Sequence, residues 1–206
     1  MVTPKICLPE DVSIVLASAS PRRREILEQI GLRFTVAVSG AEETISPEMS
    51  PAMAVQSLSL LKAADVAKSQ SAEALVIGAD TVVVFENEIL TKPKDWDEAK
   101  AMLRKLSGKA HSVLTGLTVF RRKDGKSVSV TEETRVYFKE LSDREIESYV
   151  HTKEPMDKAG SYGIQGLGGL FVEKIDGDYY NVVGLPLARL GILLKEEFNL
   201  ELTWEV

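Results

Sequence analysis

The segment Ser18–Arg24 brings two serines, a proline and three consecutive arginines to the start of a predicted helix, Ser20–Ile30. The free N–H groups in the first turn of a helix bind anions, and arginine guanidinium groups match the oxygens of phosphate. Three cations at this end of a helix are unfavourable unless a strong anion neutralises them. The segment therefore predicts a phosphate site. The alternative is a solvated basic helix start whose arginines pair with Glu25 or Glu28.

A single carboxylate, Asp80, interrupts the apolar run Leu75–Val84 two residues after Gly78. An ionised carboxylate in a buried strand is costly unless it is paired or bound to a metal. Asp80 is therefore a candidate catalytic base or cation ligand. The alternative is an aspartate that accepts hydrogen bonds at a strand end or at a bulge marked by Gly78.

Four further charged residues are candidates for a site that binds phosphate and metal. Glu42 and Glu43 are adjacent in a polar loop and carry the oxygen ligands that hard divalent cations prefer. Lys92 precedes a proline, and Lys62 lies in the otherwise apolar helical stretch Leu58–Ala64. Each pair has an alternative, since the glutamates could be solvated and both lysine ammonium groups could extend into water.

The segment Glu154–Gly166 alternates charged residues with glycines and offers few core positions. Glycine lets a backbone approach a ligand closely, and long loops of this kind often carry function. Gln165 offers a donor and an acceptor together, which suits the edge of a nucleobase. The alternative is a glycine-rich turn region that packs tightly under a sheet.

The elements that must position these residues alternate between helices and strands. Turns at Asp124-Gly125 and Asp176-Gly177 predict two hairpins, so a mixed sheet is favoured over a purely parallel one. The predicted helices are Ser20–Ile30, Ala52–Ser69, Asp95–Leu106, Ser142–Thr152 and Pro186–Phe198. The predicted strands are Ser13–Ser18, Phe34–Val38, Ala72–Phe85, His111–Arg121, Ser127–Lys139, Phe171–Ile175 and Tyr179–Val183.

Composition narrows the class of protein. The chain has 206 residues, a formal net charge of −6, one cysteine and two histidines. This predicts no internal disulfide, no zinc cage and no broad nucleic-acid surface, and the hydropathy pattern predicts no membrane span. We expect one domain over residues 13–206 in the reducing cytoplasm. Residues 1–12 are expected to be a loose extension rather than a signal peptide.

Five motifs in order, spanning Ile14 to Leu194, resemble the Maf family. They are Ser18-x-Ser20-Pro21-Arg22-Arg23, Gly78-x-Asp80-Thr81, Lys92-Pro93, Glu154-Pro155-x-Asp157-Lys158-Ala159-Gly160-x-Tyr162-Gly163-Ile164-Gln165-Gly166, and Asn181-Val182-Val183-Gly184-Leu185-Pro186. The resemblance implies a nucleoside triphosphate pyrophosphatase that cleaves between the α- and β-phosphates with a divalent metal, Mg²⁺, Mn²⁺ or Co²⁺. It also implies a mixed α/β fold with a long twisted sheet flanked by helices and two lobes around a cleft, similar to inosine-triphosphate pyrophosphatases.

The resemblance also assigns roles to single residues. Asp80 matches the family's proton acceptor, and together with Glu42 or Glu43 it matches the acidic positions at the metal. Thr81 and Gln165 resemble the branch that acts on dTTP and UTP. The specificity positions are Arg22, Thr81 and Gln165. The phosphate-binding positions are Ser18, Ser20, Arg23, Lys62 and Lys92.

Two functions from different classes are compatible with these residues. One is the hydrolase, whose partner is a nucleoside triphosphate. The other is a nucleotide-binding regulator of cell division that does not cleave its ligand. Asp80 favours the hydrolase, because a pure binding site has little reason to place a carboxylate beside a triphosphate without a metal. The oligomeric state is left open between a monomer and a homodimer.

Overall fold

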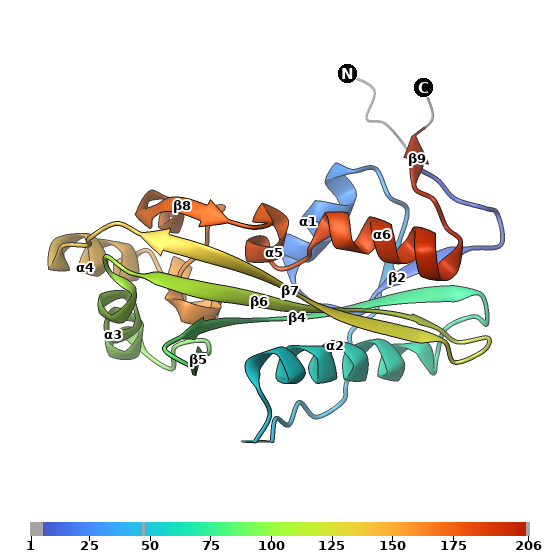
Figure 1. The fold of residues 1–206 in the computed structure, drawn as a ribbon, viewed down its shortest axis with the longest axis horizontal. Coiled ribbons are helices and arrows are strands. Elements are labelled where there is room, and N and C mark those ends of the chain that lie inside the picture. Colours follow the sequence, from blue (N-terminus) through green and yellow to red (C-terminus); the bar gives the residue numbers. More distant parts are fainter. Residues whose placement is uncertain (1–5, 47, 205–206) are drawn as a thin grey trace. The chain divides into compact units, whose positions relative to one another are not determined.

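The computed structural model describes residues 6–46 and 48–204 (Figure 1). Its main sheet consists of β2 (Ser13–Leu16), β3 (Thr35–Val36), β4 (Ala74–Phe85), β5 (Glu88–Leu90), β6 (Ala110–Arg121), β7 (Ser127–Phe138) and β8 (Val172–Asp176). The strand order is β3-β2-β4-β6-β7-β8, and β5 pairs with β4. β2 runs parallel to β3 and β4, whereas the β4–β5 and β7–β8 pairs are antiparallel. Helices flank this mixed sheet, which confirms the predicted α/β class.

The chain divides into two compact units. The first comprises the residues up to Asp80, residues 115–132 and those from Gly184 onward; the second comprises residues 81–114 and 133–183. Strands β4, β6 and β7 contribute residues to both units. The single domain expected over residues 13–206 stays a prediction.

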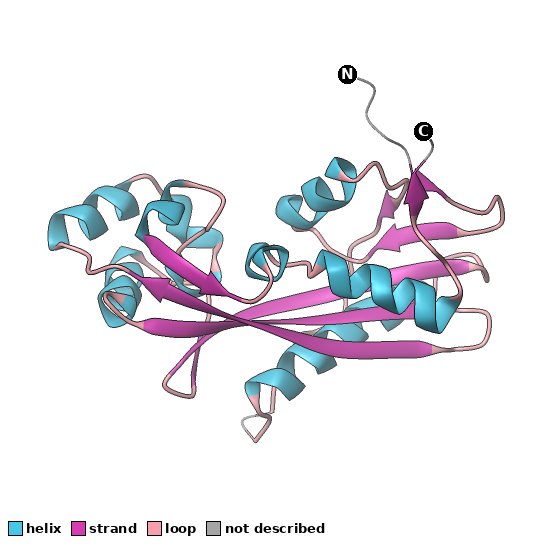
Figure 2. Cartoon of the chain, turned by 45° about the horizontal axis from the view of Figure 1, so that its top comes forward, coloured by secondary structure: helices cyan, strands magenta, loops and turns pink. Residues whose placement is uncertain are grey.

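The first unit holds three helices: α1 (Pro21–Gln29), α2 (Pro51–Ala67) and α6 (Leu187–Phe198). In both Figure 1 and Figure 2, α2 lies on one side of the strands of this unit, and α1 and α6 lie on the other. Small and β-branched residues let α2 pack closely on β2 and β4. The buried residues of this cluster are Val15, Ala17, Ala63, Val66, Ala67, Ala74 and Val76.

A two-stranded sheet joins the two ends of the described chain. β1 (Ile6–Cys7) pairs antiparallel with β9 (Thr203–Trp204). The side chain of Ile6 is buried, and its backbone N–H donates to the carbonyl of Gly31 at 3.1 Å. Of the extension expected to be loose, residues 1–5 lie outside the described residues, whereas Ile6 and Cys7 belong to this pair.

The second unit holds α3 (Trp96–Leu106), α4 (Asp143–His151), α5 (Tyr179–Val183) and the short 3₁₀ segments η1 (Glu154–Asp157), η2 (Ala159–Ser161) and η3 (Leu167–Phe171). Polar side chains start its helices: Asp95 accepts the N–H of Glu98 at α3, and Ser142 and Glu145 form a complete capping box at α4. Its core combines aliphatic side chains with aromatic residues that meet edge to face. The aromatic residues include Phe138, Tyr149, Tyr162 and Phe171.

The strand predicted over Tyr179–Val183 is wrong, because these residues form α5. Asp178 starts the helix: its carboxylate accepts the N–H of Tyr180 at 2.8 Å. The buried amide of Asn181 donates to Thr134 Oγ1 at 3.0 Å and ties the helix to β7. The hairpin predicted at Asp176-Gly177 is therefore also wrong, and β8 pairs with β7 instead.

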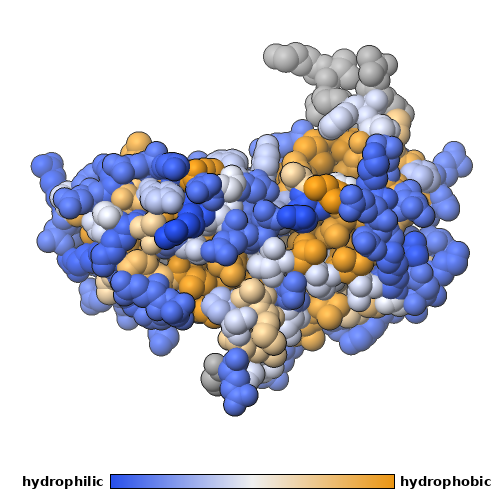
Figure 3. All heavy atoms as spheres, in the orientation of Figure 1, coloured by the Kyte–Doolittle hydropathy of each residue, from blue (hydrophilic) through white to orange (hydrophobic). Residues whose placement is uncertain are grey.

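The surface is mixed in character. Figure 3 shows hydrophilic side chains over most of the visible face, with smaller hydrophobic areas between them. Within residues 6–46 and 48–204, no helix has the length and apolar character needed to cross a membrane.

Candidate active site

The predicted phosphate segment lies where β2 passes into α1. Ser20 occupies the N-cap position and Pro21 the first turn, but the Ser20 side chain makes no capping hydrogen bond. Instead, the backbone N–H of Ser20 donates to Ser18 Oγ at 3.2 Å. Ser18 is buried at the end of the strand. The hydroxyl group of Ser18 therefore fixes the entry of the chain into the helix.

Arg23 is held at this helix start by two hydrogen bonds. Its Nε donates to the carbonyl of Gly184 at 2.7 Å, and its Nη1 donates to Ser18 Oγ at 3.1 Å. Gly184 is distant in sequence but belongs to the same unit. The guanidinium plane of Arg23 is thus oriented before any ligand binds.

The pKa of Arg23 shows which charges surround it. Burial lowers this pKa most, the charge of Asp80 raises it, Arg22 lowers it and Glu43 raises it, with a net decrease. Arg22, Asp80 and Glu43 therefore act on Arg23 electrostatically within one unit. The predicted phosphate ligands and the predicted acidic residues converge.

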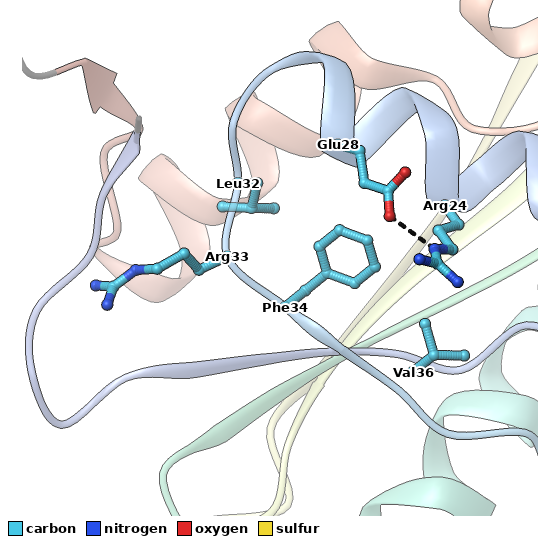
Figure 4. Close-up of a pocket in the computed structure, with 6 residues that line it drawn as sticks. All are labelled: Arg24, Glu28, Leu32, Arg33, Phe34 and Val36. Carbon is cyan, nitrogen blue, oxygen red and sulfur yellow. Dashed lines mark hydrogen bonds and ion pairs between the residues drawn. The ribbon is translucent and has the colours of Figure 1, made fainter. Parts of the chain in front are cut away.

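The third arginine belongs to a different surface. Arg24 is exposed, and its Nε donates to Glu28 Oε1 at 2.7 Å, one helical turn away (Figure 4). For this residue the alternative reading, an ion pair with Glu28, is the one observed. The pair belongs to a surface pocket lined by Arg24, Glu28, Leu32, Arg33, Phe34 and Val36.

Close packing of α2 on β4 positions the central charges. A Cβ atom on Gly78 would lie 2.2 Å from the backbone oxygen of Ser59 and 3.0 Å from Ala63 Cβ, so only glycine fits there. Gly78 therefore marks a helix–strand contact, where we had considered a bulge. Lys62 is next to Ala63 on α2, and Asp80 follows Gly78 on the same face of β4 because side chains alternate along a strand. This contact brings Lys62 and Asp80 together.

The ammonium of Lys62 bridges two carboxylates. Its Nζ lies 2.5 Å from Asp80 Oδ1 and 3.0 Å from Glu43 Oε2. The side chains of Lys62 and Asp80 are only 13% and 15% exposed, whereas that of Glu43 is 51% exposed. The mostly buried carboxylate of Asp80 is thus compensated by a charge at hydrogen-bond distance.

Asp65, which the sequence analysis missed, holds the loop that carries Glu43. Its Oδ2 accepts the hydroxyl of Ser39 at 2.8 Å and the backbone N–H of Gly40 at 3.0 Å. The Ser39 bond, followed by the ion pair with Lys68, keeps the pKa of Asp65 below its usual range. No local signal in the sequence distinguishes Asp65 from an ordinary exposed helix residue.

The two candidate glutamates differ in position. Glu43 is in the bridge with Lys62, whereas Glu42 is exposed and makes no ion pair in the described chain. Within residues 6–46 and 48–204, no three histidine, cysteine or acidic side chains form a cluster that could hold a metal. Magnesium is commonly held by one or two carboxylates together with substrate phosphates. Asp80 and Glu43 fit such a cation, one that binds with its substrate.

The remaining predicted residues lie in the second unit. Thr81 is half-buried and follows Asp80 in β4; Lys92 is exposed in the loop before α3. Gln165 is exposed in the glycine-rich segment, and its side chain has no hydrogen-bond partner among the described residues. The structure therefore assembles Ser18, Arg22, Arg23, Glu43, Lys62 and Asp80 in one unit, and holds Thr81, Lys92 and Gln165 in the other.

A buried polar pair lies in the second unit next to the glycine-rich segment. His111 Nε2 is hydrogen-bonded to the hydroxyl of Tyr162 at 2.7 Å, and its Nδ1 is buried with no partner in the described part of the chain. Burial lowers the pKa of His111 to about 4. The imidazole is therefore neutral at pH 7 and packs in the core against Phe138 and Tyr162.

Comparisons with known proteins show which proteins this chain is similar to. A family model described as Maf-like protein matches residues 13–197. A dTTP/UTP pyrophosphatase of Thermoanaerobacter sp. (strain X514) is 55% identical over 191 residues, which cover 93% of this chain and 100% of that protein. Proteins of the same name from Alkaliphilus oremlandii (strain OhILAs) and Bacillus cereus (strain G9842) are each 52% identical over 92% of this chain, covering 98% and 97% of their own lengths.

Proposed function

This chain belongs to the Maf-like protein family, and from this we propose that it is a nucleoside triphosphate pyrophosphatase that hydrolyses dTTP and UTP to a monophosphate and pyrophosphate. The observation that carries the proposal is the bridge of Lys62 between Asp80 and Glu43, next to the arginine-rich start of α1. It joins a candidate base, a candidate cation site and a phosphate-binding helix start in one unit. The family resemblance inferred from the motifs is confirmed.

The start of α1 supplies the positive charge that a triphosphate requires. Arg23 is oriented by Ser18 and Gly184, and the first-turn N–H groups of α1 lie beside it. Phosphoryl transfer depends mainly on positioning and on electrostatic stabilisation of the phosphate oxygens. In our proposal Arg22, Arg23 and Lys62 bind the phosphate chain, and Ser18 and Ser20 shape the turn around it. Lys92, in the second unit, stays a predicted phosphate ligand.

Asp80 acts as the general base in our proposal. It accepts a proton from the water that attacks the α-phosphorus, while the bond to the β-phosphate oxygen breaks and pyrophosphate leaves. Asp80 and Glu43 would hold the divalent cation. When bound, the cation supplies charge neutralisation and lowers the pKa of a coordinated water. Lys62 compensates these carboxylates, and in our proposal its ammonium also binds a phosphate oxygen of the triphosphate.

Gln165 and Thr81, both in the second unit, set the choice of base in our proposal, and Arg22 stays a predicted specificity residue. An amide can accept from N3–H of uracil or thymine and donate to an adjacent carbonyl. Cytosine lacks N3–H, so it leaves one of these groups unpaired, and such mismatches are strongly penalised in a closed site. We therefore expect dTTP and UTP ahead of CTP, and all three ahead of ATP and GTP.

A triphosphate screen with product analysis tests the proposal. The full chain is incubated with each of five triphosphates in Mg²⁺, Mn²⁺ or Co²⁺, with a chelator as the control, and early products are separated by ion exchange. UTP should give UMP and pyrophosphate. UDP and orthophosphate would overturn the proposed reaction. Tight UTP binding without product in any metal would favour the non-hydrolysing regulator.

A further inference from the structure

The glycine-rich turn that carries Gln165 is hydrogen-bonded to the carboxylate of Glu154. Glu154 Oε1 accepts the hydroxyl of Tyr149 at 2.9 Å and the backbone N–H of Gly168 at 3.1 Å. Its Oε2 accepts the backbone N–H of Leu167 at 3.0 Å. Three donors therefore converge on a partly buried side chain. Two of them are backbone groups directly after Gln165 and Gly166.

The turn also fits tightly against Glu154 and its neighbours. A Cβ atom on Gly166 would lie 2.5 Å from Glu154 Oε1, and one on Gly168 would lie 2.7 Å from the hydroxyl of Tyr149. A Cβ atom on Gly163 would lie 2.6 Å from Cε of Lys158. Gly163, Gly166 and Gly168 are thus explained by close approach to Lys158, Glu154 and Tyr149. For these three glycines the contacts match the tight packing considered as the alternative to close approach to a ligand.

Glu154 is held as a charged group. Its partial burial alone would raise its pKa, but the N–H groups of Leu167 and Gly168, the hydroxyl of Tyr149 and the charge of Lys158 together lower it. Lys158 also donates to the backbone carbonyl of Glu154 at 2.6 Å. A charged acceptor with three donors holds a peptide segment more strongly than neutral contacts do.

The position of Gln165 depends on this support and on two backbone hydrogen bonds of the turn, from the N–H of Gly166 to Gly163 O at 3.3 Å and from the N–H of Gly169 to Gly166 O at 3.1 Å. Its side chain is exposed and makes no hydrogen bond within residues 6–46 and 48–204, so the backbone of the turn fixes the point from which its amide extends. A recognition group discriminates well only when its supporting contacts hold it in place before binding.

We propose that Glu154 is a positioning residue for base selection, because its carboxylate fixes the turn at residues 163–168 and so fixes the point from which the Gln165 side chain reaches the base. Tyr149 assists by orienting the carboxylate and by accepting the N–H of Gly163 at 3.3 Å. The inference rests on the proposed function for the role of Gln165. It goes beyond that function by assigning a residue that does not contact the substrate.

The test compares Glu154→Gln with matched variants of the full chain. Glutamine keeps the shape of the side chain but replaces one acceptor oxygen with a donor, so one hydrogen bond is lost. Glu173→Gln is the control, because Glu173 is an exposed glutamate of β8 in the same unit. Gln165→Glu is the reference variant, because it changes the side chain proposed to contact the base. Tyr149→Phe removes one hydrogen-bond donor to the Glu154 carboxylate.

The readout is the ratio of kcat/KM for UTP to kcat/KM for CTP, measured with the inhibition constant of tripolyphosphate and the melting temperature. Glu154→Gln should lower the ratio about tenfold, through KM more than kcat, with tripolyphosphate inhibition within about twofold of wild type. Tyr149→Phe should lower the ratio by a smaller factor, and Glu173→Gln should leave it unchanged. An unchanged ratio in Glu154→Gln, or an equal loss of activity on both nucleotides, would overturn the proposal.

Calorimetry with α,β-imido-dUTP and α,β-imido-dCTP separates this inference from the proposed function. If the wild-type chain binds both analogues but hydrolyses no triphosphate, the pyrophosphatase proposal fails. The dUTP/dCTP binding ratio then still decides the role of Glu154. If hydrolysis occurs and Glu154→Gln keeps the wild-type ratio, only the role of Glu154 fails.

Discussion

The ammonium of Lys62, on α2, lies 2.5 Å from the carboxylate of Asp80, in the middle of β4. A carboxylate that is only 15% exposed is costly to bury without a compensating charge, and Lys62 supplies that charge. Glu43 shares the same ammonium at 3.0 Å from a more exposed position. The ammonium of Lys62 therefore pairs with one mostly buried and one exposed carboxylate.

Asp80→Asn should abolish most activity while preserving the fold. The amide has the shape of the carboxylate but cannot take a proton from water, and Lys62 keeps Glu43 as an ionic partner. We expect kcat for UTP to fall by about 100-fold or more, the scale of a lost general base. Pyrophosphate release measures kcat, and thermal unfolding checks the fold. Near wild-type turnover by the folded variant would exclude Asp80 as the base.

The neighbouring glutamates form a matched pair of variants. Glu43→Gln weakens the bridge with Lys62 and removes a candidate cation ligand, so the metal concentration needed for half-maximal activity should rise about tenfold or more. Glu42→Gln changes an exposed side chain outside the bridge and should leave that concentration within about twofold of wild type. Titrations of UTP hydrolysis with metal measure this concentration for both variants. Equal responses of the two variants would contradict the assignment to Glu43.

Arg23 and Arg24 should respond very differently to substitution. Arg23→Lys keeps the charge but loses the planar geometry that bonds Gly184 and Ser18, so kcat/KM for UTP should fall by about tenfold or more. Arg24→Ala removes only an exposed pair with Glu28, and solvent screens such pairs so that they add little to stability. Its activity should stay within about twofold of wild type. Equal losses in both variants would indicate a general basic patch.

Local signals made the start of the chain predictable. A buried strand, a serine at the N-cap and a proline in the first turn lie in one short stretch, and the structure places β2 and α1 there. The hairpin around Asp124-Gly125 is also confirmed, because β6 and β7 are neighbours in the sheet and Arg121 N donates to Lys126 O. The strand predicted at Tyr179–Val183 is wrong because the β propensity of these residues is outweighed by the helix cap at Asp178 and by tertiary contacts.

The geometry of the site could be predicted only in part. Residue type pointed to Asp80, Lys62 and the glutamates, but not to the bridge between them, since the bridge depends on the approach of α2 to Gly78. The choice between Glu42 and Glu43 depends on the loop that Asp65 holds. Both contacts join segments distant in sequence, and no spacing rule along one element encodes them.

Gly78→Ala should damage stability and the site together. The added methyl would lie 2.2 Å from the backbone oxygen of Ser59, so α2 must shift away from β4 and carry Lys62 with it. We expect a loss of about 3 kcal/mol in the free energy of unfolding, at the upper end of overpacking effects. Gly191→Ala is the control: nothing lies within 4 Å of its added Cβ, and alanine in α6 should stabilise by about 0.5–1 kcal/mol. Urea unfolding measures both, and effects of the same sign would contradict the packing argument.

His111 should make the folded state less stable in mild acid. Burial lowers the pKa of His111 from 6.5 to about 4. Between these two pH values the imidazole is protonated in the unfolded chain but stays neutral in the folded chain. Stability therefore rises with pH across this window and is lost as the pH falls below 6.5. At 1.36 kcal/mol per pKa unit, the loss between about pH 7 and pH 5 should be about 2 kcal/mol from this residue. His111→Gln has no titrating group at this position. Between pH 7 and pH 5 its free energy of unfolding should therefore fall by about 2 kcal/mol less than that of the wild type. An NMR titration of the wild-type imidazole provides the direct check, and protonation of His111 near pH 6.5 in the folded protein would show that the argument is wrong.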